Sequence, residues 1–85
     1  MIYRIIYHAH ALQELEKLGR DAQRKIIRAI EQRLTQAPEI YGKPLRYSLK
    51  GLWALWAGDY RIIYNIEKEE IIVLRIGHRR EVYNR

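Results

Sequence analysis

The stretch that decides the fold is Gly51-Leu-Trp-Ala-Leu-Trp-Ala-Gly-Asp-Tyr-Arg-Ile-Ile-Tyr64. Its two apolar runs, separated by the tight turn Gly58-Asp59, predict a β-hairpin. Side chains alternate between the two faces of a strand. One face of the first strand should therefore carry Trp53, Leu55 and Ala57, and the other Leu52, Ala54 and Trp56. Arg61 interrupts the second strand, where an arginine is costly unless its head reaches water or an anion. The hairpin predicts a sheet with one covered face and one open face, which Arg61 reaches.

The composition indicates one small folded domain, residues 1–85, with a basic surface. Lys and Arg number 16 against 10 Asp and Glu, for a net charge of +6 and a pI near 9.8. This balance favours a polyanionic partner (nucleic acid, a ribosomal surface or an acidic protein), and a merely basic surface is the alternative. The absence of Cys excludes disulfides and thiolate metal sites. No apolar run approaches the about 20 residues of a membrane span, so we expect a cytoplasmic protein.

Hydrophobic periodicity predicts the remaining elements. Residues 2–7 form a strand, and His8 is a polar residue near the start of the helix that follows, which Gly19 ends. Asp21 caps a second helix that runs to about Gln36 and stops at Pro38. The first buried stripe consists of Leu12, Leu15 and Leu18 with Ala9 and Ala11, and the second of Ile26, Ile27, Ile30 and Leu34.

Outside the hairpin, residues 71–76 are predicted to form the final strand, and residues 45–49 are a candidate for one more. Without that candidate the order is β-α-α-β-β-β. This is an α+β, two-layer domain in which a helical hairpin packs on one face of a largely antiparallel sheet.

The C-terminal stretch, Ile76-Gly-His-Arg-Arg-Glu-Val-Tyr83-Asn-Arg85, gathers the candidate functional groups. Gly77 would release the last strand into a cluster of cations around His78. Arginine grips phosphate through a planar fork of donors, histidine titrates near neutrality, and tyrosine stacks on a base. The alternative is a solvated, frayed terminus. A metal site at His8 and His10 would need further ligands, so we expect none.

Over essentially the whole chain, the sequence resembles the RelE/ParE superfamily of toxins. The segments that carry the resemblance are Pro44-Leu45, Leu49-Lys-Gly-Leu-Trp53, Gly58-Asp-Tyr-Arg-Ile-Ile-Tyr64 and the C-terminal stretch. The RelE-like branch is the better match. The resemblance implies a toxin that enters the ribosomal A site and cuts mRNA there. It implies no metal or organic cofactor. It also implies a cognate acidic antitoxin, with which the toxin represses its own operon.

The resemblance assigns roles to several residues. Arg61 looks like the arginine that stabilises the phosphate, Arg79 like the second arginine of the site, and Tyr83 like the tyrosine that stacks on or orients a nucleotide. Chemistry as much as resemblance makes His78 the candidate general acid or base. The further candidates for RNA contact are Lys50, Trp56, Arg80 and Arg85.

One departure leaves alternatives open. Relatives often carry basic residues on the strand before Gly-Asp-Tyr-Arg, where this chain has Leu52, Ala54 and Trp56. Trp56 could stack on an mRNA base, which is worth about 1–3 kcal/mol, or lie against the antitoxin. The alternatives to an endoribonuclease are a ParE-like inhibitor of DNA gyrase and a weakened toxin that acts mainly as an antitoxin-binding co-repressor.

Overall fold

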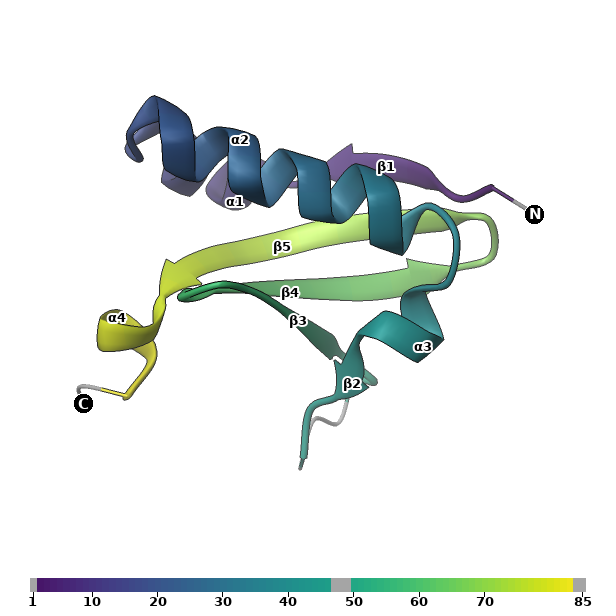
Figure 1. Cartoon of the computed structure of the whole chain (residues 1–85). Coiled ribbons are helices and arrows are strands. Elements are labelled where there is room, and N and C mark those ends of the chain that lie inside the picture. The colour runs from purple at the N-terminus through teal and green to yellow at the C-terminus, as the bar shows by residue number, and fades with distance from the viewer. Residues whose placement is uncertain (1, 47–49, 84–85) are drawn as a thin grey trace.

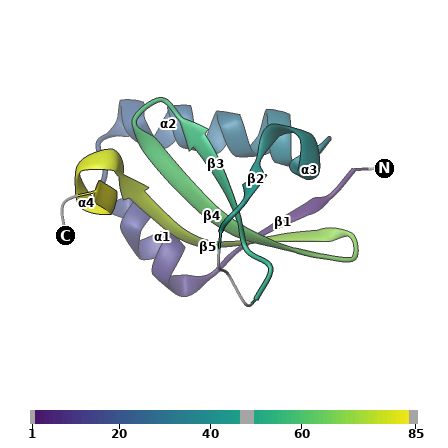
Figure 2. The same ribbon diagram turned by 90° about the horizontal axis from the view of Figure 1, so that it is seen from below.

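The computed structural model describes residues 2–46 and 50–83. In this part of the chain, helices α1 and α2 cover one face of a five-stranded sheet (Figure 1), and the view from below has both helices behind the strands (Figure 2). The elements are β1 (Arg4–Tyr7), α1 (Ala9–Glu16), α2 (Arg20–Ala29), the π-helical turn η1 (Ile30–Leu34), α3 (Pro38–Tyr41), β2 (Lys43–Pro44), β3 (Trp53–Ala57), β4 (Tyr60–Glu67), β5 (Glu70–His78) and α4 (Arg79–Tyr83). The predicted α+β, two-layer class is confirmed.

The sheet is built around the predicted hairpin. Its strand order is β1-β5-β4-β3-β2, with β1 parallel to β5 and the other neighbours antiparallel. Trp56 on β3 pairs with Arg61 on β4. At the tip of the hairpin Gly58 has φ 61°, a left-handed conformation that glycine adopts without steric cost. The tight turn expected there is confirmed.

The core lies between the sheet and the helices. On β3, Leu55 and Ala57 are 3% and 4% exposed, whereas Trp56 is 37% exposed, so the predicted division of this strand into two faces is confirmed. The buried cluster consists of Ala11, Leu15, Ile26, Ala29, Ile30 and Leu34 from the helices and Leu55, Ala57, Ile62, Tyr64, Ile71, Val73 and Ile76 from the sheet.

Helix α1 differs from its prediction in part of its face and in its end. Ala11, Leu15 and Leu18 are confirmed on the buried stripe, whereas Leu12 is 44% exposed and Ala9 is exposed as well. Ala11, Leu15 and Leu18 are four and three residues apart, which keeps them on one stripe of the helix and turns Leu12 toward solvent. His8 is confirmed as a polar residue at the start of the helix, because its Nδ1 accepts a hydrogen bond from the N–H of His10.

The expected roles of Gly19 and Asp21 were wrong. Gly19 has φ −66° and ψ 163°, an extended conformation, and it is the N-cap of α2 rather than the end of α1. Its carbonyl accepts the first helical hydrogen bond, from the N–H of Gln23. Helix α1 ends at Glu16 and α2 begins at Arg20, so Asp21 already lies inside α2 and is not its cap. Asp21 lies in the first turn, where a negative charge favours the helix dipole.

The expected stop before Pro38 is confirmed, since η1 ends at Leu34. Pro38 also opens α3, because proline at the first helical position gives up no hydrogen bond. Two further expectations are corrected. A short strand occupies Lys43–Pro44 instead of residues 45–46, and residues 47–49 lie outside the described part of the chain. Gly77 does not release β5. It pairs with Arg61 inside the ladder, and the chain continues into α4.

Tyr64 attaches α3 to the sheet. Its side chain is fully buried, and its hydroxyl donates a hydrogen bond to the carbonyl of Pro38 at 2.5 Å. Burial, aided by the charge of Glu39, raises the pKa of Tyr64 to about 12, so the phenol remains a donor at neutral pH. Gly42 makes this approach possible, since a Cβ there would lie 1.8 Å from the Tyr64 hydroxyl.

None of the described helices is long and apolar enough to span a membrane.

We expect Gly42→Ala to lower the free energy of unfolding by about 1–3 kcal/mol, because the added methyl overlaps a hydroxyl that cannot move without losing its hydrogen bond. Gly19→Ala is the matched control. It meets nothing within 4 Å and should change stability by less than about 1 kcal/mol. Urea unfolding of both variants checks this, and equal losses would contradict the role given to Tyr64.

Candidate functional site

Arg61 is the centre of the open face. It is half-buried on β4, between Trp56 on β3 and Gly77 on β5. Gly77 has no side chain, which leaves a hollow of about 170 Å³ on the β5 side, lined by Glu14, Arg61, Ile63, Arg75, Ile76, Gly77 and Glu81. On the β3 side a hollow of about 460 Å³ is lined by Arg33, Tyr41, Lys43, Pro44, Leu45, Ala54, Leu55, Trp56 and Arg61. Arg61 thus lines both of these hollows.

Glu14 organises the β5 side. Strand β1 ends at Tyr7, opposite Val73, so in the described residues it is α1 that lies along the rest of this edge. Glu14 accepts the N–H of Ile76 at 2.9 Å and forms a two-pronged ion pair with Arg75, whose Nη2 lies 2.9 Å from Oε2. Partial burial alone would raise the pKa of Glu14. The hydrogen bonds from Arg75 and Ile76 outweigh burial and hold that pKa below its usual value.

A capping box starts α4. The backbone N–H of His78 donates to Glu81 Oε1 at 2.9 Å, and His78 Nδ1 accepts the N–H of Arg80 at 3.1 Å. The next residue ties the helix to the hairpin turn. Arg79 donates its N–H to the carbonyl of Asp59 at 2.7 Å, and its guanidinium lies 3.5 Å from the Asp59 carboxylate. The part of the C-terminal stretch that the structure describes, up to residue 83, is therefore an anchored helix rather than the frayed terminus that was the alternative.

The structure brings some of the predicted site residues together and separates others. Arg61 and Trp56 are cross-strand neighbours on the open face. His78 instead pairs with Tyr60, whose ring it meets edge-on at 5.1 Å, and Tyr60 packs against the core. Strand alternation therefore places His78 on the opposite face from Arg61. Since Nδ1 accepts a hydrogen bond, the neutral ring carries its proton on Nε2.

The other predicted residues are dispersed. Arg79 is engaged with Asp59, and Arg80 is exposed on α4. Lys50 is exposed in the turn before β3. Tyr83 is the last residue of α4, with a side chain outside the described part of the structure, and Arg85 lies outside it altogether.

Three residues of the site were missed by the sequence analysis. Lys43 on β2 pairs with Ala54, so it supplies a cation beside one of the β3 positions where the resemblance had led us to expect one. Arg33, from η1, lines the same hollow as Arg61, and Glu81 lines the other. The sequence carries a signal only for Glu81, which stands three residues after His78, the spacing of a capping box.

In the described residues, His, Asp and Glu form no group of three or more that could hold a metal ion. The expected absence of a metal and of an organic cofactor stays a prediction.

The model of one protein family, described as the ParE toxin of the type II toxin–antitoxin system parDE, matches residues 5–83. The chain belongs to this family. Within it, the relatives are of the RelE type. Toxin RelG of Mycobacterium tuberculosis is 31% identical over the full length of both chains, and Toxin RelE of the same organism is 29% identical over 95% of this chain and 86% of the relative. The chain is thus a RelE-family toxin of a type II toxin–antitoxin system, as the resemblance indicated.

Solved structures agree with this assignment. The toxin–antitoxin complex RelBE2 of M. tuberculosis contains a chain with a TM-score of 0.82 and 27% identity, over 92% of this chain and 99% of that one. The isolated E. coli RelE toxin has the same fold, with a TM-score of 0.74 at 24% identity over 96% of this chain and 92% of that one.

We expect Glu14→Gln to lower the free energy of unfolding at pH 7 by about 1 kcal/mol. The change weakens an ion pair whose acid and base side chains are 28% and 64% exposed, which limits its value. The folded-state pKa of Glu14 is depressed, so its stabilising contribution is present above the usual value of 4.5 and is lost as the pH falls through the lower folded value. The difference between wild type and variant should shrink accordingly below pH 4.5, as followed by urea unfolding.

Glu16→Gln, an exposed change on the same helix, is the control and should alter stability little at either pH. A constant difference between wild type and Glu14→Gln from pH 7 to pH 3 would contradict the role given to the Glu14 charge.

Proposed function

We propose that this toxin is a ribosome-dependent endoribonuclease that cuts mRNA in the A site without a metal. The observation that supports this most is the position of Arg61, which is half-buried at the centre of the open face with a hollow on each side. A guanidinium held in place by two neighbouring strands is preorganised for a phosphate whose negative charge grows in the transition state. Membership of the RelE family supports the same chemistry.

The reaction needs only the groups of RNA itself and a proton acceptor. The ribose 2′-oxygen attacks the adjacent phosphorus, the bond from phosphorus to the 5′-oxygen breaks, and the products are a 2′,3′-cyclic phosphate and a free 5′-hydroxyl. The proton of the 2′-hydroxyl passes to a base of the protein. The departing 5′-oxygen takes a proton from solvent, which reaches this open face. Arg61 stabilises the five-coordinate phosphorus between these steps.

Substrate positioning falls to the groups beside Arg61. Trp56 offers its ring for stacking on a base next to the cleaved bond. Lys43 and Arg33, which line the hollow on the β3 side, contact the neighbouring phosphates. The side chains of Arg79 and Asp59 are both 60% exposed, so a phosphate can reach Arg79 and replace Asp59 as its partner. Tyr83 keeps the nucleotide-orienting role that the resemblance implies, and Arg80 and Lys50 remain candidates for RNA contact.

Glu81 is better placed than His78 to be the base. It lines the hollow that contains Arg61, whereas His78 lies on the other face of the sheet. Its capping bond uses Oε1. We assign Oε2 to the 2′-hydroxyl and give His78 the task of starting α4, the helix that carries Glu81.

The partners we propose are a cognate acidic antitoxin, the ribosome with its mRNA and, through the antitoxin complex alone, operator DNA, all in the cytoplasm. The RelE toxins of M. tuberculosis, Pyrococcus horikoshii and E. coli have been solved in complex with their antitoxins. The net charge of +6 favours an acidic partner here as well.

A second candidate function is inhibition of DNA gyrase. The family model is described by ParE, and β3 places Ala54 and Trp56 rather than cations on the open face. Accumulation of gyrase–DNA cleavage complexes with intact mRNA would favour this candidate.

Arg61→Ala should abolish A-site cleavage, because no other cation of the described residues lines both hollows around the site. The measurement adds purified protein to ribosomes programmed with a defined mRNA and maps 5′ ends by primer extension. Arg20→Ala, at the exposed first residue of α2, removes the same charge from a residue that lines neither hollow and should cleave normally. Cleavage by a folded Arg61→Ala protein at the wild-type rate would remove Arg61 from the site.

Glu81→Gln should slow single-turnover cleavage by about 10²–10⁴-fold while leaving the fold intact. Glutamine still accepts the capping hydrogen bond but cannot take the proton of the 2′-hydroxyl. His78→Asn is the matched comparison, since asparagine also caps a helix. It should keep most of the activity. The opposite ranking of the two variants would return the proton transfer to His78.

A further inference from the structure

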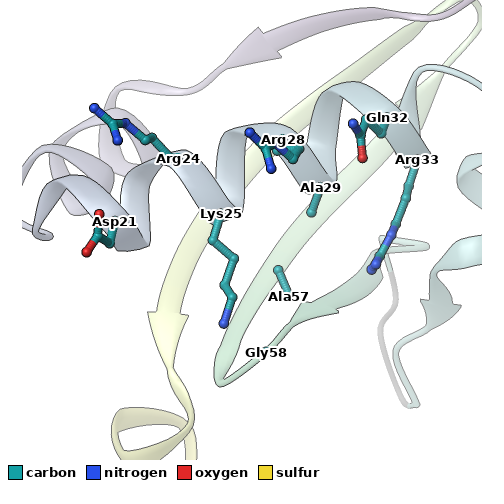
Figure 3. Close-up of a pocket in the computed structure, with 9 residues that line it drawn as sticks. All are labelled: Asp21, Arg24, Lys25, Arg28, Ala29, Gln32, Arg33, Ala57 and Gly58. Atoms are coloured by element: carbon teal, nitrogen blue, oxygen red, sulfur yellow. The ribbon is translucent and has the colours of Figure 1, made fainter.

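A third hollow, which the proposed chemistry does not use, lies between α2 and the tip of the β3–β4 hairpin. It has a volume of about 400 Å³ and is lined by Asp21, Arg24, Lys25, Arg28, Ala29, Gln32, Arg33, Ala57 and Gly58 (Figure 3). We refer to this hollow as the α2 groove.

Small residues open the α2 groove, and long cations border it. Ala29 on the helix and Ala57 on the strand form its floor, and both are buried. Lys25 and Arg33 point from the helix toward the sheet, whereas Arg24 and Arg28 point away along the rim (Figure 3). Lys25 reaches the hairpin turn, since its Nζ lies only 2.7 Å from the place where a Cβ of Gly58 would be.

The charges of the α2 groove are not balanced within the chain. Four cations (Arg24, Lys25, Arg28 and Arg33) face one acid, Asp21. In the described part of the chain, none of these four cations takes part in an ion pair, whereas Arg4, Arg75 and Arg79 each have an acidic partner. Like charges one helical turn apart repel each other. A bound polyanion would relieve this repulsion and release counterions.

The α2 groove is continuous with the site around Arg61. Arg33 lines both the α2 groove and the hollow that contains Arg61 and Lys43. The α2 groove and this hollow meet at the edge of the sheet. There β2 pairs with β3 only at Trp53 and Ala54, so it does not cover β3 as far as Ala57. A band of cations therefore runs from Arg61 across Arg33 to Lys25 and Arg28.

We infer that the α2 groove binds the sugar–phosphate backbone of the same RNA strand whose cleaved bond lies at Arg61, several nucleotides away from that bond. This inference rests on the proposed function. Arginine and lysine contacts to phosphate position a strand without reading its bases, so the groove adds affinity and not sequence preference. An acidic antitoxin segment fits less well, because a segment that folds on binding needs apolar surface to bury and the floor offers only two buried alanines.

The test measures binding of 2′-O-methyl RNA, which lacks the attacking hydroxyl and cannot be cleaved. Fluorescence anisotropy compares a 4-nucleotide and a 20-nucleotide strand on the full chain across a salt series. The groove variant is Lys25→Gln/Arg28→Gln, which leaves Arg33 intact. The matched control, Lys17→Gln/Arg20→Gln, removes the same charge from exposed positions that do not line the α2 groove.

The groove variant should bind the longer strand on the order of tenfold more weakly, and its slope of log affinity against log salt should fall by about 1.4, or about 0.7 for each lost phosphate contact. Binding of the short strand should not change, and the control should match wild type. Equal affinity of wild type and groove variant for the longer strand would overturn the inference, as would a wild type that gains nothing from the longer strand.

Two further measurements identify other occupants. A groove variant that loses affinity only for empty ribosomes, or only for the antitoxin, would assign the α2 groove to that partner and overturn the inference. The A-site cleavage assay of wild type separates this result from failure of the proposed function. Cleavage without any effect of the groove variant on RNA binding refutes the groove alone. Absence of cleavage with a preserved length effect refutes the nuclease and leaves a groove that binds RNA.

Discussion

The pairing register of β3, β4 and β5 is the constraint on which the molecule depends. Trp56, Arg61 and Gly77 are partners across three strands, and the buried residues alternate with them on the other face. Because the side-chain period of a strand is two, a slip of one residue would carry Arg61 into the core and Ile62 into solvent. Burial of the apolar face therefore holds the guanidinium in position, and the stability of the core and the geometry of the site have one cause.

The rims of the sheet give the site its walls. At β5, strand β1 stops early, and α1 covers the remaining edge with Glu14, which satisfies a backbone N–H and binds Arg75. At β3, a two-residue strand brings Lys43 beside Ala54 and leaves the end of β3 to face α2 and η1. An edge of unpaired backbone groups invites uncontrolled pairing. The devices that cover these edges are also the ones that place charged side chains around Arg61.

The cations expected on β3 are supplied by other elements. Lys43 comes from β2 and Arg33 from η1, while β3 contributes Trp56. This arrangement keeps the hairpin strand apolar, which favours its packing, and it still surrounds the site with positive charge. The unbalanced charge along α2 extends the same field around the rim of the sheet, where a long polyanion could follow it.

The sequence by itself determined the two-layer α+β fold, the hairpin with its glycine turn, the two faces of β3 and the open-face position of Arg61. All of these follow from local periodicity and from the cost of burying a charge. It located the helix ends poorly at Gly19, because glycine serves at either end of a helix and only the chain path decides which. Tertiary structure alone decided that His78 and Arg61 lie on opposite faces, since the strand was expected to end at Ile76. It alone also brought Lys43, Arg33 and Glu81 to the site. Residues far apart in a chain meet only through strand pairing and helix packing, and neither leaves a local pattern in the sequence.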